Sequence, residues 1–234
     1  MIRMNPREII QKAYEEKRRK LLEHEAFEII KAYNIPAPET AIARSLEEAI
    51  KIAEKIGYPL VLKIVSPDIS HKSDVGGVIL NIKSKEELIK AFNKIYENVS
   101  KNAPGARIVG VLIQKMAPKG LEVIIGGLRD NIFGPVVMFG LGGIFVEVLK
   151  DVSFRIAPLT EEDAFEMMSE IKASKLLEGY RGQPPVDKKS LAKIILSVSK
   201  LLEENPEIES IDLNPVMAYP DNAVVVDARI ILKT

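Results

Sequence analysis

The arrangement of apolar segments changes near residue 103, and that change limits the folds available to the chain. Before it, strand patterns at Leu60–Val65 and at residues 77–82 alternate with amphipathic stretches of helical period. After it, several strand patterns follow one another over short links, which favours an antiparallel sheet. The sequence therefore predicts an α+β protein built from two lobes.

Capping residues and prolines define most of the expected helices. Residues 6–33 are predicted to form one long helix, which Ile35-Pro36 ends. Ser45 and Ser84 each have a glutamate three positions later, so each is expected to begin a helix with a capping box. The other expected elements are helices over 160–171 and 187–204, and strands over 41–43, 107–116, 121–128, 134–139, 152–157, 208–218 and 223–231.

The charge balance and the lack of cysteine exclude several classes of function. Lys+Arg and Asp+Glu both number 33 in the 234 residues, whereas a nucleic-acid binder normally has a basic excess. Without cysteine there is no disulfide framework, thiolate metal site or cysteine nucleophile. No uncharged apolar run reaches the roughly 20 residues that span a bilayer, and the N-terminus lacks the apolar core of a secretory signal. We therefore expect a cytoplasmic protein that binds neither nucleic acid nor membrane.

His71 is one of two histidines, and it lies in a loop of small, polar and cationic residues over 66–77. Imidazole is a competent nucleophile toward phosphorus, and its charge is adjustable near neutral pH. Gly76 and Gly77 end the loop, and glycine lets backbone N–H groups approach phosphate oxygens. These features indicate a histidine that carries a phosphoryl group beside a nucleotide site. His24, between two glutamates of the first helix, is interpreted as an ordinary helix residue.

Lys63 interrupts the apolar strand Leu60–Val65, and two interpretations are open. It is either an edge-strand lysine whose ammonium reaches water or a cation that neutralises nucleotide phosphates. Further along, Gln114-Lys115-Met116-Ala117 ends one strand, and Glu122 begins the next. A crossover between strands offers backbone groups to an adenine edge, and a carboxylate accepts ribose hydroxyls. Strand glutamates are more often simply solvated.

The segment over 139–147 is a second glycine-rich stretch after an apolar strand. No Gly-Lys-Ser/Thr follows it, so it is not a P-loop, and its GxGG spacing is not the dinucleotide fingerprint. A tight structural turn is the alternative. Arg155, on the strand after Asp151, is a candidate contact to a phosphate or to another subunit.

The C-terminal hairpin places three polar side chains in an otherwise apolar setting. Asp212 and Asn214 lie two residues apart and so share one strand face, and Asp227 interrupts the returning strand. Hard oxygen ligands from Asn214 and Asp227, completed by phosphate oxygens and water, are what Mg²⁺ requires. The alternative is a turn-forming Asn-Pro beside a strand-end carboxylate.

Taken together, these segments resemble the β subunits of ADP-forming acetyl-CoA synthetases, in the nucleoside-diphosphate-forming acyl-CoA synthetase family related to succinyl-CoA synthetase. The resemblance runs from about Leu22 to the C-terminus, and residues 1–20 carry little of it. It is carried by Leu60–Lys63, Ser66–Gly77, Gln114–Gly126, Phe139–Pro158, Leu177–Pro185 and Ile211–Pro215.

The resemblance implies an ATP-grasp fold in which two lobes hold ATP or ADP between them. The expected division is an N-terminal helical extension over 1–20, a lobe over 21–102 that carries the phosphohistidine loop, and a lobe over 103–234. It also implies a CoA-binding α subunit in an α2β2 heterotetramer. The implied reaction is acyl-CoA + ADP + phosphate ⇌ carboxylate + ATP + CoA. This chain is expected to be inactive for that full reaction without the α subunit.

The resemblance also implies roles for residues of this sequence. His71 is the phosphoryl carrier, and the segment from Pro67 to Gly77 is expected to swing between two sites. The remaining implied roles are Asp212 orienting His71, Lys63 and Gly76-Gly77 contacting phosphates, Gln114 to Ala117 meeting adenine, Glu122 meeting ribose, and Asn214 and Asp227 holding Mg²⁺. Glu147, Asp151 and Arg155 match family positions with open roles.

Two other functions are compatible with parts of the pattern. One is an ATP-grasp ligase that joins a carboxylate to an amine through a free acyl phosphate and needs no phosphohistidine. The other is a regulatory module that binds nucleotide without turnover, against which His71, Asn214 and Asp227 argue together. The acid substrate stays open among acetate, branched and aryl acids, as does ADP against GDP. The roles of residues 1–20 and 179–185 are also open.

Overall fold

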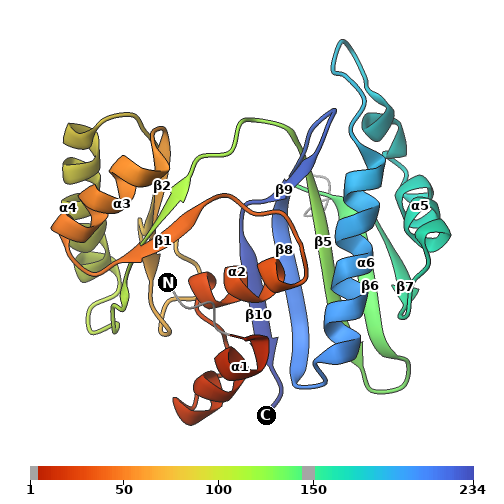
Figure 1. The fold of residues 1–234 in the computed structure, drawn as a ribbon, viewed down its shortest axis with the longest axis horizontal. Helices are drawn as coiled ribbons and strands as arrows, with labels where there is room; N and C mark the ends of the chain where they lie inside the picture. The colour runs from red at the N-terminus through yellow and green to blue at the C-terminus, as the bar shows by residue number, and fades with distance from the viewer. Residues whose placement is uncertain (1–4, 144–150) are drawn as a thin grey trace. The chain divides into compact units, whose positions relative to one another are not determined.

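The computed structural model describes residues 5–143 and 151–234 of the chain (Figure 1). Contacts divide the chain into two compact units. Unit 1 contains the chain up to Leu21, Glu25–Ala37 and Pro118–Thr234, and unit 2 contains Leu22–His24 and Pro38–Ala117. Each unit has its own antiparallel sheet and its own helices. The α+β class expected from the sequence is confirmed.

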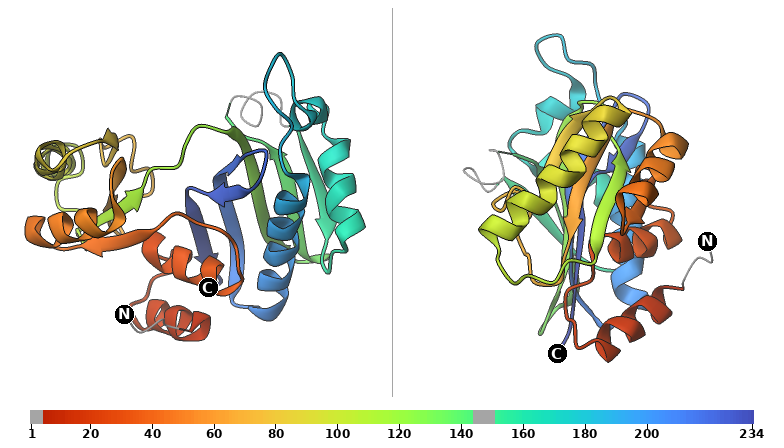
Figure 2. Two further views of the ribbon diagram at one scale, coloured as in Figure 1. Left: turned by 45° about the horizontal axis from the view of Figure 1, so that its top comes forward. Right: turned by 90° about the vertical axis from the view of Figure 1, so that its left-hand side faces the viewer.

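Unit 2 is a four-stranded sheet covered by two helices. The sheet has the order β1-β4-β2-β3, with β1 (Thr40–Ala43), β2 (Leu60–Val65), β3 (Val78–Ile82) and β4 (Gly110–Lys115). Figures 1 and 2 show α3 (Leu46–Ile56) and α4 (Lys85–Asn102) packed on one side of this sheet. Ser45 and Ser84 begin these helices, because each Oγ accepts a hydrogen bond of 3.2 Å from the N–H of the glutamate three residues on. Every residue of β2 is buried.

Unit 1 is a larger sheet with two helices on one face. Its path is β10-β8-β5-β6-β7, and β9 also pairs with β8. The strands are β5 (Leu121–Asp130), β6 (Gly134–Leu141), β7 (Val152–Ile156), β8 (Ile208–Ala218), β9 (Ala223–Val225) and β10 (Ala228–Leu232). In Figure 1, α6 (Lys188–Glu204) covers β5 and β6, and α5 (Glu161–Glu170) lies beside it over β7. In residues 5–143 and 151–234, no helix has the length and apolar character needed to cross a membrane.

The helix predicted over residues 6–33 is wrong in one respect, because the structure has two helices there. They are α1 (Pro6–Glu15) and α2 (Glu23–Ala32). Lys17 adopts a positive φ of 54°, which ends the helical path. The next residues then pair with the C-terminal strand, since Leu21 N–H donates to the Ile230 carbonyl and Leu232 N–H donates to the Arg19 carbonyl. The segment therefore extends the sheet of unit 1.

The boundary expected near residue 103 also differs from the structure. The boundary at residue 103 puts the strand predicted over 107–116 in the second lobe. In the structure this strand is β4, and it pairs with β1 and β2 in the sheet of unit 2. The division falls instead between Ala117 and Pro118, and the N-terminal segment belongs to unit 1. The physical reason is that a strand pattern indicates extended backbone without identifying the strand with which it pairs.

A buried ion pair holds the N-terminal segment in unit 1. Arg18 Nη1 and Nη2 donate to the two carboxylate oxygens of Glu25 at 2.8 and 2.9 Å. The two side chains are only 5% and 6% exposed. A bidentate geometry of this kind is the strongest form of the guanidinium–carboxylate contact.

We expect Glu25→Gln to lower the free energy of unfolding by about 3 kcal/mol, because it removes the buried bidentate partner of Arg18 and leaves only the half-exposed Glu16 as its counter-ion. Urea unfolding followed by circular dichroism measures this loss. Glu209→Gln is the matched control, since it breaks the Arg19–Glu209 pair, whose side chains are 51% and 47% exposed. That change should cost about 1 kcal/mol or less. Equal losses of unfolding free energy in the two variants would contradict a stabilising role for the buried Arg18–Glu25 pair.

Candidate functional site

The predicted site residues divide between the two units. Unit 2 contains Lys63, His71, Gly76, Gly77 and the segment Gln114 to Ala117. Unit 1 contains Glu122, Asp151, Arg155, Asp212, Asn214 and Asp227. His71 and the residue expected to orient it, Asp212, therefore belong to different units. Glu147 lies outside the described residues.

His71 is exposed in the loop that joins β2 to β3. On its N-terminal side, Ile69 is buried in the core of unit 2, and the Asp68 carboxylate accepts the N–H of Arg107 at 2.7 Å. On its C-terminal side, Asn98 and Asn102 of α4 donate side-chain N–H groups to the carbonyls of Gly76 and Val75. The imidazole is thus presented to solvent between two fixed points.

Lys63 lies in the interior of its sheet and is not an edge-strand lysine. β2 pairs with β4 on one side and with β3 on the other. Lys63 Nζ donates to Glu23 Oε1 at 2.6 Å, and both side chains are buried. The interpretation of a lysine that reaches water along a sheet edge is therefore wrong. Contact between its ammonium and a phosphate stays a prediction.

Gly76 and Gly77 close the loop tightly against β2 and α4. Gly76 has a φ of +66°, and a side chain there would approach the Asn98 amide within 2.7 Å. A Cβ on Gly77 would lie 2.5 Å from a methyl carbon of Ile64. Their N–H groups donate to the carbonyls of Ser73 and Lys72 at 3.0 and 2.7 Å. The glycines therefore have a packing role here, and donation to a phosphate would require these bonds to open.

The segment Gln114 to Ala117 is tied to its own sheet. Lys115 Nζ donates to the carbonyls of Gly57 and Tyr58 at 3.1 and 2.6 Å, so it holds the C-terminal end of α3. The N–H groups of Lys115 and Met116 donate to the carbonyls of Glu39 and Pro59. These three donors are committed within unit 2. Contact of this segment with adenine stays a prediction.

Glu122 is exposed near the start of β5, where the glycine-rich segment reaches it. Gly142 N–H donates to the Glu122 carbonyl at 2.8 Å. A Cβ on Gly142 would meet Glu122 atoms at 3.1–3.2 Å, so glycine permits the close approach. A Cβ on Gly143 would lie 3.7 Å from Glu122 Oε2, so the carboxylate also lies beside this second glycine. Contact of Glu122 with ribose stays a prediction.

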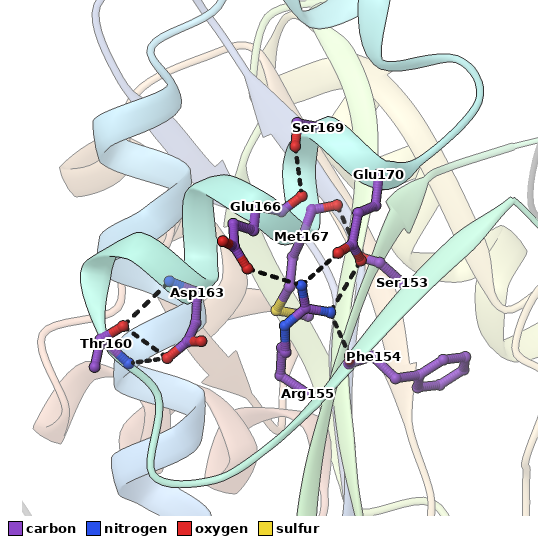
Figure 3. Close-up of polar contacts among 9 residues, drawn as sticks. All are labelled: Ser153, Phe154, Arg155, Thr160, Asp163, Glu166, Met167, Ser169 and Glu170. Atoms are coloured by element: carbon purple, nitrogen blue, oxygen red, sulfur yellow. Dashed lines mark hydrogen bonds and ion pairs between the residues drawn. The ribbon is translucent and has the colours of Figure 1, made fainter.

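Asp151 and Arg155 have structural partners in unit 1. The buried carboxylate of Asp151 accepts the N–H groups of Lys172 and Ala173 at 2.7 and 2.8 Å. Figure 3 shows Arg155 of β7 reaching Glu166 and Glu170 of α5. The hydrogen bonds that Arg155 donates to these two carboxylates raise the pKa of Arg155 above its ordinary value. Both residues hold α5 and the turn that follows it against the sheet.

The C-terminal hairpin brings the two predicted metal ligands together. Asn214 N–H donates to the Asp227 carbonyl at 3.2 Å, where the strand opposite β8 is interrupted between β9 and β10. The strand predicted over 223–231 is therefore two strands, with Asp227 at the interruption. This backbone contact makes the two residues neighbours, and their side chains carry the amide and carboxylate oxygens that a small hard cation takes as ligands. Phosphate oxygens and water would complete its coordination.

Asp212 is half-buried on the same strand as Asn214. Its register partners are Gly126 of β5 and Arg229 of β10. Burial raises the pKa of Asp212 above its ordinary value, and the charge of Arg229 acts in the opposite direction. A partly desolvated carboxylate of this kind accepts a strong hydrogen bond from a protonated or N–H donor.

The structure adds residues that the sequence did not single out. Glu23 and Lys72 join Lys63 in one ion-pair cluster, although Glu23 is 40 residues from Lys63 in the chain. In unit 1, Tyr180 and Gln183 line a pocket of about 340 Å³ together with residues 119–121. Lys72 could have been noticed as the cation beside His71, but no local signal marks Glu23.

Comparison with known proteins identifies the family. A family model described as an ATP-grasp domain matches residues 12–232. Subunit β of acetate–CoA ligase [ADP-forming] I from Pyrococcus furiosus is 58% identical over 226 residues, which are 97% of each chain. The chain thus belongs to the ATP-grasp family and, within it, to the β subunits of ADP-forming acetate–CoA ligases.

Solved structures agree with this assignment. An acetyl-coenzyme A synthetase 1 of Ca. Korarchaeum cryptofilum, in complex with coenzyme A, Ca-AMPCP and HgCl⁺, superposes with a TM-score of 0.96 at 53% identity. The match covers 98% of this chain and 100% of that one. A second structure of that enzyme has a phosphorylated phosphohistidine segment and superposes with a TM-score of 0.93 at 52% identity, with the same coverage. The family, the ATP-grasp fold and the ligase class implied by the sequence resemblance are confirmed.

Proposed function

We propose that His71 carries a phosphoryl group between the partner subunit and a nucleotide bound by this chain. The observation that carries the proposal is the presentation of His71. It is exposed between anchored residues, one position from a cluster that contains two lysine ammonium groups. A solved relative at 52% identity contains a phosphorylated phosphohistidine segment, which supports this role for the loop.

The transfer consists of two displacements at phosphorus. In the first, a ring nitrogen of neutral His71 donates its lone pair to the phosphorus of a phosphoryl group on the partner subunit. A P–N bond forms, and the bond to the donor breaks with its electron pair leaving on the donor. In the second, a β-phosphate oxygen of ADP attacks phosphorus, the P–N bond breaks, and ATP and the free imidazole result. Positioning and charge neutralisation are what such a transfer needs.

The residues of this chain supply both needs. Lys63 is a cation held on an interior strand, and Asp212 is half-buried. In the proposed transfer, the Asp212 carboxylate would accept a hydrogen bond from the second ring nitrogen of the imidazole. Glu122 would accept ribose hydroxyls, and the backbone of residues 114–117 would meet adenine. Asn214 and Asp227 fit Mg²⁺ and would hold it, and the ion would neutralise phosphate charge. The backbone hydrogen bond that makes Asn214 and Asp227 neighbours supports the metal assignment.

The remaining parts of the reaction belong to the partner. Relatives are named as β subunits, so a second subunit completes the enzyme. We propose that this subunit binds CoA, forms the acyl phosphate, and assembles with the present chain as α2β2. The partner subunit would then select the acid, and acetate is the first one to test because relatives at 58% and 52% identity are acetate–CoA ligases.

A labelling experiment tests this function. The chain is incubated with its partner subunit, Mg²⁺ and [γ-³²P]ATP, and the phosphate on this chain is characterised for acid and alkali stability. We expect acid-labile, alkali-stable label that maps to His71 and disappears when ADP is added. Label that is absent, or that is found only on another residue, would reject the carrier role. An ATP-grasp amine ligase would form product without labelling this chain.

A further inference from the structure

A cluster of three charged side chains, two buried and one partly buried, joins the His71 loop to β2 and α2. The carboxylate of Glu23, the first residue of α2, forms two ion pairs. Lys63 Nζ of β2 lies 2.6 Å from Oε1, and Lys72 Nζ of the loop lies 2.9 Å from Oε2. The exposed fractions of the Glu23, Lys63 and Lys72 side chains are 5%, 6% and 20%. All three residues belong to unit 2. One carboxylate is thus shared by two ammonium groups from different elements.

The cluster keeps Glu23 charged. Burial alone would raise the pKa of Glu23, but the charges and hydrogen bonds of Lys63 and Lys72 hold that pKa below its ordinary value. The carboxylate is therefore ionised at neutral pH. Two cations and one anion leave the cluster with a net positive charge, which favours a phosphoryl group on the neighbouring histidine.

Lys72 is fixed through both its backbone and its side chain. Its carbonyl accepts the N–H of Gly77 at 2.7 Å, and the Gly77 carbonyl accepts the N–H of Ile64 at 2.8 Å, next to Lys63. Its ammonium is held by Glu23. His71, one residue earlier, is exposed. The position of the imidazole relative to β2 therefore depends on where Lys72 is held.

We propose that Glu23 is a positioning residue for phosphoryl transfer, because its carboxylate fixes Lys72 and, through it, the His71 loop relative to Lys63. The proposal rests on the proposed role of His71 as phosphoryl carrier. Glu23 touches neither phosphate nor nucleotide in this role. It sets the distance between the carrier and the strand that supplies the cation.

Single-turnover kinetics of the assembled enzyme test the proposal. The rate at which [γ-³²P]ATP with Mg²⁺ labels His71 is measured for wild type, Glu23→Gln and Lys72→Met, at a temperature where circular dichroism shows each variant folded. Misplacing a reacting group by about 1 Å slows reaction by about 100-fold, so we expect both variants to be slower by about 10- to 100-fold. Lys72→Met should leave the ATP concentration for half-maximal labelling within about twofold of wild type, because it removes positioning rather than nucleotide binding.

Two further variants separate positioning from general loss of structure. Glu25→Gln removes an equally buried carboxylate two residues along α2 that pairs with Arg18, so it should lose stability and label within about twofold of the wild-type rate. Glu23→Asp keeps the charge and should label faster than Glu23→Gln. Wild-type labelling rates in both Glu23→Gln and Lys72→Met would overturn the proposal, as would an equal slowing in Glu25→Gln. If wild-type His71 is never labelled, the proposed function fails, and the role of Glu23 fails with it.

Discussion

Replacing His71 with alanine should abolish acyl-CoA-dependent ATP formation by the assembled enzyme. Loss of a covalent nucleophile typically costs on the order of 10³-fold or more in turnover. His71 is exposed, so the substitution removes no core packing and should change the free energy of unfolding by only about 0.5 kcal/mol. The measurement is the initial rate of ATP formation from acetyl-CoA, ADP and phosphate with the partner subunit present.

The second histidine of the chain provides the control for this result. His24→Gln should keep both activity and acid-labile label, since His24 lies on α2 and outside the His71 loop. Nucleotide binding by His71→Ala, measured by calorimetry with ADP and Mg²⁺, should stay near the wild-type value. If His71→Ala keeps more than about a tenth of wild-type turnover, the carrier role is wrong.

Asp227→Asn should raise the Mg²⁺ requirement of the enzyme and lower its turnover. The substitution keeps the shape of the side chain but removes the negative charge beside Asn214. A metal ion contributes several kcal/mol to a phosphoryl-transfer transition state, and a loss of about 3 kcal/mol corresponds to about 100-fold in rate. We therefore expect kcat to fall by about 100-fold and half-maximal activity to need about tenfold more Mg²⁺. Titration of activity against Mg²⁺ measures both quantities.

Asp221→Asn is the matched control on the same hairpin. Asp221 is exposed in the turn between β8 and β9, where it accepts a hydrogen bond from Asn222. This change removes the same charge without reaching Asn214, so the Mg²⁺ titration should match wild type. Binding of Mn²⁺ in the presence of ADP, followed by electron paramagnetic resonance, should weaken only in Asp227→Asn. Equal Mn²⁺ affinity in the two variants would reject the ligand assignment.

Elements with strong local patterns could be predicted from the sequence with their bounds. The patterns predict β2 and β8 at the residues where they occur, because β2 is an apolar run with one lysine and β8 alternates apolar and polar residues from Ile211 to Asn214. α5 was expected from Thr160 and Asp163, which do form a reciprocal capping box. In such segments the local preference and the tertiary structure agree, so inspection of a few residues is sufficient.

The errors arose where long-range pairing decides the structure. No proline or glycine lies between Glu15 and Glu23, so the sequence contains no signal for the break between α1 and α2. The break exists because residues near Leu21 pair with β10, more than 200 residues away. In the same way, the pattern of β4 predicted a strand but not its place between β1 and β2.

The candidate site shows the same limit. Residue chemistry indicated His71, Asn214 and Asp227, and the hairpin does bring the last two together. The sequence could not indicate that Asp151, Lys115 and Arg155 already have protein partners, because those partners are distant in the chain. Nor could it connect Glu23 with Lys63 and Lys72. Residue chemistry identifies candidate side chains, but only the fold shows which of them already form hydrogen bonds or ion pairs within the protein.

The split membership of α2 has a practical consequence for dissecting the protein. Glu23 pairs with Lys63 in unit 2, whereas Glu25 pairs with Arg18 in unit 1. An excised fragment of residues 38–117 would contain the whole four-stranded sheet, yet its Lys63 and Lys72 would have lost the acid that joins them. A fragment that begins at residue 38 thus lacks α2 and, with it, the Glu23 counter-ion. A fragment of unit 2 that keeps this ion pair has to begin before Leu22.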